Sequence, residues 1–234
     1  MSAPVTIYWP PSSKTSSVIA SKQNGAANQP LVLNSSIVGQ PLGPYIMDRM
    51  IREVSIFSTS DLSGVTFALS GIGSPVDANG NPTQVLGSVT EQITGPNNGS
   101  VPSVNIYAQV TSIIPNNPAQ NVEVGLGVSG ITDYIFLDYD RAIFQASAQV
   151  QFINRQNMTA TVYQSLTKPQ SPDSVYGNLI NFPQPMPAFP VTNFSAVTNN
   201  TLQMIQTPVA TVWANIQATT TDSLYFTVLQ QGIR

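Results

Sequence analysis

The chain of 234 residues contains no histidine and no cysteine. The first absence removes the commonest general base and a leading metal ligand. The second removes the thiol nucleophile and excludes disulfides, iron–sulfur clusters and thiolate zinc sites, and it leaves the redox compartment undetermined. We therefore expect a protein that is not an enzyme, has no cofactor and binds no catalytic transition metal.

Charge is also scarce, because only 8% of the residues are charged and the net charge is −3, where soluble domains usually have about a quarter of charged residues. Eight scattered basic residues form no stripe that would neutralise phosphates, and no basic amphipathic stretch occurs. Nucleic acid and membranes are therefore not expected as direct partners. No apolar run approaches the roughly 18 residues of a membrane span, and residues 1–14 lack the layout of a signal peptide, so we expect a soluble protein.

Carboxylates are the remaining candidates for chemistry. Asp138 and Asp140 would share one face of a strand, where they could hold a hard cation such as calcium or perform acid–base work on a sugar. A solvated strand end with Arg141 as the counter-charge is the favoured interpretation. Residues 77–82 have the composition of a calcium loop around Asp77. Their glycine comes too early and no bidentate glutamate follows, so the Asn-Gly pair favours a turn.

Alternation of apolar and polar residues is the strongest structural signal in the chain. Residues 104–110, 122–128 and 146–152 alternate with the period of a half-buried strand. Turn clusters rich in Gly, Pro, Asn and Asp separate such runs, which favours an all-β sandwich or barrel.

Three stretches have the form of two alternating runs around a small polar loop, namely residues 55–73, 146–166 and 215–234. We interpret each as a β-hairpin, with Val65, Phe67 and Leu69 facing inward in the first. Leu224, Phe226 and Val228 face inward in the last. Residues 45–51 place apolar side chains at helical spacing and allow a single helical turn.

The predicted fold is all-β, with two tandem antiparallel β-sandwich domains, Ig-like or jelly-roll-like, preceded by an extended N-terminal arm. The arm covers residues 1–40, the first sandwich residues 41–128 and the second residues 129–234. A single larger jelly roll with a long insertion is the alternative.

The arm is rich in Ser, Asn, Gln and Pro, and it has too little apolar surface to fold alone. We expect its few apolar side chains to be interaction residues that pack against another subunit. They are Ile7, Tyr8, Trp9, Leu31 and Leu33. A disordered terminus is the alternative.

Five segments of the chain carry a resemblance to a known class of proteins. Residues 52–56, 62–67, 91–97, 107–113 and 226–233 resemble a β-rich module and chain endings found in structural proteins of tailed-bacteriophage virions. The resemblance covers about half of the chain and consists of strand and turn patterns. It implies a component of the virion, and it transfers no functional residues because the matching positions look like core and turn.

The resemblance and the neutral, amide-rich surface together predict a non-enzymatic structural protein of a virion. The expected role is a minor capsid or decoration protein, a cement protein that reinforces contacts between capsomers after assembly in the host cytoplasm. Its partners would be copies of itself, as a homo-oligomer, and other virion proteins such as the major capsid protein or neck proteins. Extended arms and sheet edges suit such contacts.

Two other functions remain open at this point. Within the virion, the chain would alternatively be a head–tail neck or tail component. In another class, it would be a carbohydrate-binding β-sandwich whose aromatic side chains stack on sugars. The candidates for stacking are Trp9, Trp213, Tyr107 and Tyr163, although the alternating strand around Trp213 favours a place in the core.

Overall fold

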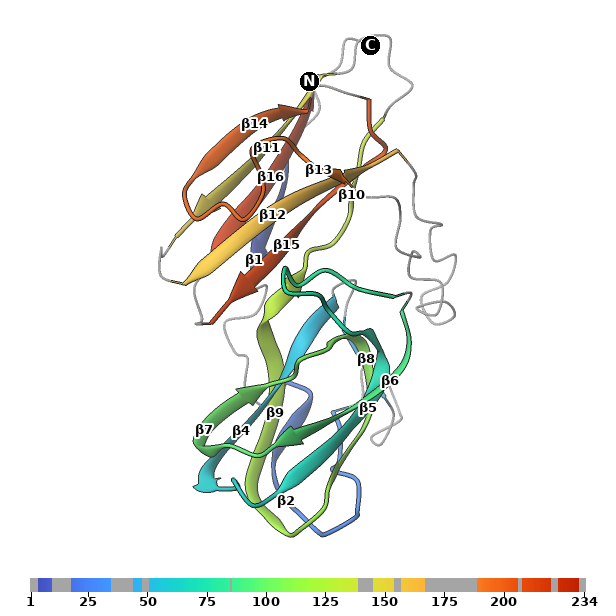
Figure 1. Ribbon diagram of the computed structural model, residues 1–234, viewed down its shortest axis with the longest axis vertical. Helices are drawn as coiled ribbons and strands as arrows, with labels where there is room; N and C mark the ends of the chain where they lie inside the picture. The colour runs from blue at the N-terminus through green and yellow to red at the C-terminus, as the bar shows by residue number, and fades with distance from the viewer. Residues whose placement is uncertain are drawn as a thin grey trace. The chain divides into compact units, whose positions relative to one another are not determined.

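A computed structural model describes residues 4–9, 18–34, 44–47, 51–84, 86–138, 145–153, 157–166, 189–205, 208–219 and 223–231. Every regular element in these ranges is a β-strand, and the strands pair antiparallel, so the predicted all-β class is confirmed. The chain forms two compact units (Figure 1). We call Ser13–Gly127 the inserted unit, because Met1–Ser12 and Val128–Arg234 together form the other, the discontinuous unit.

The inserted unit consists of two rows of strands. Its strands are β2 (Ala20–Gly25), β3 (Tyr45–Ile46), β4 (Ile51–Asp61), β5 (Thr66–Ser74), β6 (Gly87–Thr94), β7 (Asn97–Pro102), β8 (Ile106–Pro115) and β9 (Ala119–Ile131), the last of which continues into the discontinuous unit. One row has the order β2-β9-β4-β7 and the other β3-β8-β5-β6. The rows are joined by a single described residue pair, Arg52 and Tyr107.

The core of this unit is formed by the apolar side chains that alternate along its strands. Phe67 and Leu69 on β5 are buried, whereas the alternate residues Thr66, Ala68 and Ser70 are partly exposed. This is the period of a strand with one solvated face. Side chains from both rows join the same hydrophobic cluster, including Ile56 on β4 and Phe67 on β5. Burial of such side chains supplies the main favourable free energy of folding.

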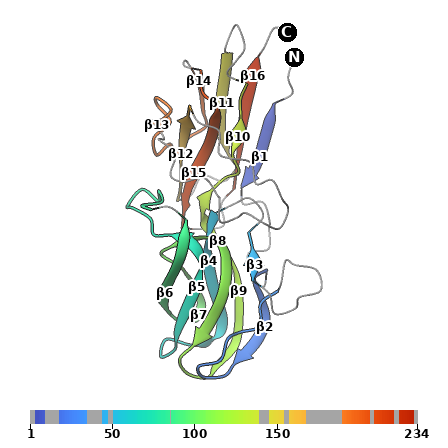
Figure 2. The same cartoon turned by 90° about the vertical axis from the view of Figure 1, so that its right-hand side faces the viewer.

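The discontinuous unit also contains two sheets (Figure 2). Its strands are β1 (Val5–Trp9), β10 (Ile135–Phe136), β11 (Gln145–Phe152), β12 (Met158–Ser165), β13 (Phe189–Pro190), β14 (Thr201–Ile205), β15 (Thr211–Ala218) and β16 (Leu224–Gln231). One sheet has the order β1-β16-β11-β14, and the other contains β13-β12-β15.

The second edge of β15 is completed by the end of β9 together with β10. Ile131 pairs with Asn215, and Ile135 pairs with Val212. Between these two contacts the Thr132 backbone N–H donates to the Ala214 carbonyl at 2.9 Å, and its hydroxyl accepts from the Ala214 N–H at 3.0 Å. The end of β9 and β10 therefore follow β15 as one interrupted strand.

The three predicted hairpins are wrong, and all three for the same reason. Among the described residues β4 pairs with β7, β8 and β9, whereas β5 pairs with β6 and β8. Likewise β11 and β12 belong to different sheets, as do β15 and β16. Alternation reports which side chains face inward and does not identify the neighbouring strand. The first stretch crosses from one row of strands to the other, and the other two stretches cross from one sheet to another.

The connection between β4 and β5 shows how such a crossing is held. Leu62 and Val65 are buried in the hydrophobic cluster, whereas the tip of a hairpin would expose them. The Leu62 N–H donates to the Pro96 carbonyl at 2.8 Å, and the Gly95 N–H donates to the Val65 carbonyl at 2.8 Å. The Ser63 N–H donates to the Asp61 carboxylate at 2.9 Å. Side chain and backbone therefore both fix the crossing.

The structure also differs from the expected arm over residues 1–40. Residues 5–9 form β1 and pair with β16, whereas β2 pairs with β9 in the other unit. The Leu31 N–H donates to the Ile113 carbonyl at 2.9 Å, so this segment is fixed by main-chain bonds. Addition to existing sheets supplies the apolar contacts and hydrogen bonds that these residues cannot make alone. The expected arm is thus divided between two units.

The helical turn allowed for residues 45–51 is absent from the described part of that stretch. Tyr45 and Ile46 form β3 and pair with Val110 and Gln109. The Met47 N–H donates to the Ala108 carbonyl at 2.9 Å, which continues the pairing with β8. Tertiary pairing has overridden a weak local pattern.

Candidate interaction face

The candidate site is the solvent side of the sheet β1-β16-β11-β14, which we call the outer face. Side chains on its opposite side, such as Phe226 and Val150, are buried. Alternation along each strand then assigns the outer side chains. They are Thr6, Tyr8, Gln145, Ser147, Gln149, Gln151, Leu202, Met204, Tyr225, Thr227, Leu229 and Gln231.

Strand register arranges these side chains in rows across the sheet. Tyr8 lies opposite Tyr225, which in turn lies opposite Gln151. The two tyrosine rings have centroids 5.3 Å apart and are tilted by 52°. Directly opposite side chains on neighbouring strands approach within about 5 Å, so this row brings two rings and one amide together.

The next row is polar at its centre and apolar at one end. Thr227 lies between Thr6 and Gln149, and Gln149 lies opposite Leu202. The hydroxyl oxygens of Thr6 and Thr227 are 3.0 Å apart and hydrogen-bonded. The row therefore offers hydroxyl and amide groups side by side on three neighbouring strands.

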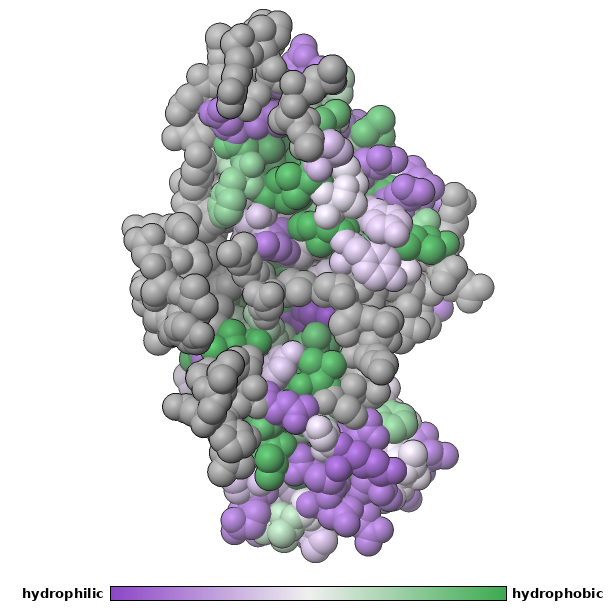
Figure 3. Space-filling model, turned by 180° about the vertical axis from the view of Figure 1, so that it is seen from behind, coloured by the Kyte–Doolittle hydropathy of each residue, from purple (hydrophilic) through white to green (hydrophobic). Residues whose placement is uncertain are grey.

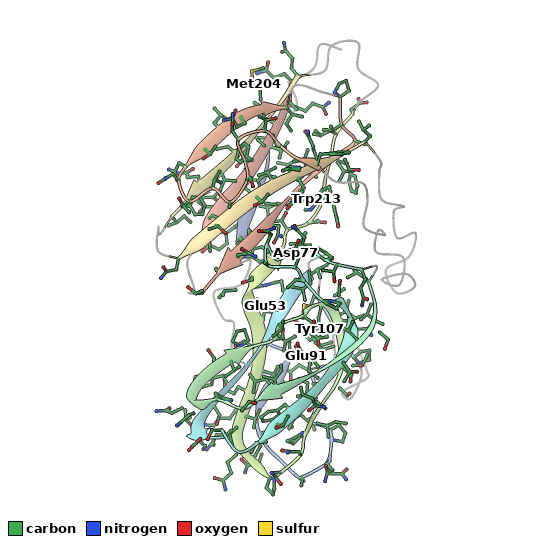
Figure 4. The ribbon with its side chains drawn as sticks, viewed as in Figure 1. Glu53, Asp77, Glu91, Tyr107, Met204 and Trp213 are labelled. Carbon is green, nitrogen blue, oxygen red and sulfur yellow. The ribbon has the colours of Figure 1, made fainter. Side chains whose placement is uncertain are left out.

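No residue of the outer face is charged, and several large side chains on it are exposed. Leu202 and Met204 on β14 are each 64% exposed, and Tyr8 and Tyr225 are each 40% exposed. Met204 is labelled in Figure 4, where it lies on the discontinuous unit. In the view from behind, hydrophobic residues lie among pale and hydrophilic ones on the described surface (Figure 3). The outer face is thus neutral, with mixed aromatic, aliphatic and amide character.

The predicted interaction residues are not brought together. Trp9 is fully buried on the inner side of β1, and its indole N–H donates to the Val128 carbonyl at 3.0 Å. Ile7 is partly buried on that same side, whereas Tyr8 belongs to the outer face. Leu31 and Leu33 are buried in the core cluster of the inserted unit. These leucines and Trp9 therefore stabilise the chain's own units and do not form an exposed surface for another subunit.

The aromatic side chains considered for sugar stacking are mostly inside. Trp9, Tyr107 and Trp213 are buried, which confirms the core interpretation of Trp213. Tyr163 stacks on Trp213 with centroids 5.9 Å apart, and Tyr134 contacts the same indole edge-on at 5.2 Å. Burial raises the pKa of Tyr134 and of Tyr107. None of the three buried rings is a surface platform.

The acidic candidates also form no assembled site. Asp138 is exposed, and its main chain is bound by the Gln230 amide, which accepts from the Asp138 N–H at 2.9 Å and donates to the Asp138 carbonyl at 2.6 Å. Asp140 and Arg141 lie outside the described residues, so the pair itself is not described. Among the residues that are described, no three or more acidic side chains come together as a metal site.

Asp77 lies in a turn, as its sequence predicted. One carboxylate oxygen accepts from the N–H groups of Asn79 and Asn81 at 2.8 and 2.9 Å, and the other accepts from the Asn81 side chain at 3.2 Å. Gly80 has a φ of 73°, a conformation that glycine adopts without strain. The carboxylate is therefore surrounded by N–H donors, which suit a closed turn rather than a cation.

Glu91 is a partly buried acidic group that the sequence interpretation missed. It lies on the inward side of β6 between Val89 and Ile93, and Figure 4 shows it next to Tyr107. One of its oxygens accepts from the N–H groups of Val104 and Asn105, each at 3.1 Å. Desolvation raises the pKa of Glu91, and these hydrogen bonds oppose the rise. Glu91 occupies an alternate position between the apolar residues Val89 and Ile93, and this spacing is the sequence signal that indicates its inward direction.

Arg52 is a second charged group in the interior of the inserted unit. It is fully buried on β4, and its guanidinium donates to the Gly127 carbonyl. Burial lowers the pKa of Arg52 to about 10, which leaves it protonated at neutral pH. It therefore ties β4 to the end of the inserted unit, a structural role.

No helix long and apolar enough to cross a membrane occurs among the described residues. Comparison with protein-family models, with curated proteins and with solved structures finds no match for this chain.

Proposed function

We propose that this chain is a non-enzymatic structural protein of a virion, built from two jelly rolls of which one is inserted into the other. The role is a minor capsid or decoration protein that reinforces the shell through contacts with its own copies and with other virion proteins. The observation that carries the proposal is the strand order, which is the same in both units.

The inserted unit supplies eight strands in chain order, from β2 to β9. The first, eighth, third and sixth form one row, and the second, seventh, fourth and fifth form the other. This alternation between rows is the order of two interleaved Greek keys, the jelly roll. In a jelly roll the third and fourth strands lie in different rows, and β4 and β5 cross between rows in this way instead of forming the predicted hairpin.

The discontinuous unit repeats this order when β1 is counted as its first strand. The end of β9 with β10 is then the second strand, and β11 to β16 are the third to the eighth. The sheet β1-β16-β11-β14 contains the first, eighth, third and sixth strands. The inserted unit therefore interrupts a second jelly roll between its first two strands, and each unit is a β-sandwich.

A doubled jelly roll supports a role in assembly because viral capsid domains commonly use this fold. The fold also serves lectins and other functions, so the fold by itself does not decide between them. The low charge adds to the argument, since neighbouring copies with 8% charged residues repel one another little. Sheet edges such as β14 add the means for main-chain contacts.

Cryo-electron microscopy of purified particles, with mass spectrometry of their proteins, tests the proposal. A decoration protein occupies many equivalent positions on the shell exterior. Density confined to a ring at one vertex would assign the neck or tail instead. Absence of the chain from the particles would overturn the proposal.

A further inference from the structure

The outer face combines exposed rings, amides and hydroxyls without any charge. A charged partner gains nothing from such a surface, because it would lose hydration without meeting an opposite charge. A neutral partner that presents hydroxyl groups matches it, since glutamine amides both donate and accept hydrogen bonds.

The outer face has no continuous apolar centre of the kind found in a protein–protein interface. Stable protein interfaces have an apolar centre and a polar rim. Here the outer side chains of the central strand β11 are all polar, those of the central strand β16 alternate Tyr225 and Leu229 with Thr227 and Gln231, and Leu202 and Met204 lie on the edge strand β14. This mixture favours a ligand that itself presents polar and apolar groups close together. It does not favour a second copy of the chain, which would need an apolar centre.

We propose that the outer face binds a neutral polysaccharide. Tyr8 and Tyr225 form an aromatic platform for the apolar faces of sugar rings, and Gln149, Gln151 and Thr227 hydrogen-bond to the sugar hydroxyls. Because the two rings are tilted by 52°, the platform fits a twisted chain of sugars rather than the flat surface of a crystal. The inference concerns the isolated protein and does not rest on the proposed place in a virion.

Neighbouring sugars and neighbouring side chains have compatible spacings. The tyrosine ring centroids are 5.3 Å apart, and successive strands are about 4.8 Å apart, which is close to the length of one pyranose ring. Gln151 lies directly opposite Tyr225, so a sugar stacked on that ring has an amide beside it.

Affinity electrophoresis of the full chain in native gels tests this inference. The gels contain dextran, a soluble β-1,3-glucan or hydroxyethylcellulose as neutral probes, and alginate as a charged one. We expect at least one neutral probe to retard the protein and alginate not to. Tyr8→Thr with Tyr225→Thr should weaken that binding at least about tenfold, a factor equivalent to about 1.4 kcal/mol.

The matched control is Phe136→Thr, which removes another exposed aromatic ring from β10 and should leave binding unchanged. Gln151→Glu is nearly isosteric and retains both tyrosines; it should weaken binding about twofold to tenfold through loss of the amide donor. Thermal melting establishes that each variant is folded. Absence of retardation by every neutral probe, or full binding by the folded double variant, would overturn the inference. So would a dimer in sedimentation that the double variant abolishes, because the face would then bind a second copy.

Discussion

Replacing Trp9 by alanine should destabilise the discontinuous unit alone. Trp9 is fully buried on β1, opposite Leu224 on β16, and its indole donates a hydrogen bond to Val128. Loss of a buried tryptophan side chain typically costs about 3–5 kcal/mol through lost burial and the remaining cavity. The Val128 carbonyl loses its indole donor and adds about 1–3 kcal/mol if water does not reach it.

Tryptophan fluorescence during urea unfolding measures this effect in one unit. The chain has two tryptophans, and both Trp9 and Trp213 belong to the discontinuous unit. In the Trp9→Ala variant, the fluorescence of Trp213 alone reports the unfolding of this unit. With a slope of about 2 kcal/mol per molar urea, the midpoint should fall by about 2 M. The matched control is Leu31→Ala, which should cost about 2–5 kcal/mol in the inserted unit and leave the tryptophan transition in place.

A midpoint unchanged within about 0.3 M for Trp9→Ala would refute the reasoning, since that shift corresponds to less than about 1 kcal/mol. Such a result would mean that the first strand is not part of the folded unit in solution. It would return residues 1–9 to the role of an arm that awaits another subunit.

Three further predictions concern the two units. A fragment of residues 13–127 should melt cooperatively, whereas residues 128–234 should do so only when a peptide of residues 1–12 is supplied; circular dichroism checks both. Glu91 has a raised pKa in the folded state, so its contribution to stability is present below its ordinary pKa of 4.5 and is lost as the pH rises through the raised value. The wild type should therefore gain stability over Glu91→Gln on acidification from neutral pH, and parallel pH profiles in urea unfolding would contradict this. Gly71→Ala would place a Cβ 2.0 Å from the Gln109 carbonyl oxygen, whereas Gly64→Ala meets nothing within 4 Å; we expect a loss of about 1–3 kcal/mol for the first and almost none for the second, measured as melting temperatures.

Local pattern was sufficient for the class of fold and for the direction of many side chains. Phe67, Leu69 and Phe226 were predicted to face inward and are buried. Glycine, proline and asparagine clusters marked turns such as the one around Asp77. These features depend on neighbours in sequence, where the period of a strand and the chemistry of turns act directly.

Strand partners were not predictable from the same pattern, because the same alternation fits a hairpin and a crossing between sheets. Val5 pairs with Val228, and nothing near either residue identifies the other. Residues 1–40 have little apolar surface of their own, and no partner strand for them was identifiable, so their composition indicated an arm. Tyr225 on the outer face was foreseeable, since it alternates with the inward Leu224 and Phe226. Leu202 and Met204 were not, because large apolar side chains at alternate positions usually indicate a buried face.

The pairing of β1 with β16 also sets the order of events during synthesis. The strand β16 is synthesised about 220 residues after β1, which takes about 10–45 s at ordinary rates of translation. The strands β2 to β8 and most of β9 lie within Ser13–Gly127, so the inserted unit can fold during that interval. The discontinuous unit can complete its sheet only after residues 224–231 have been synthesised. A chain whose synthesis stops before residue 224 therefore contains the inserted unit together with unpaired strands of the discontinuous unit, and such unpaired strands are open to proteolysis.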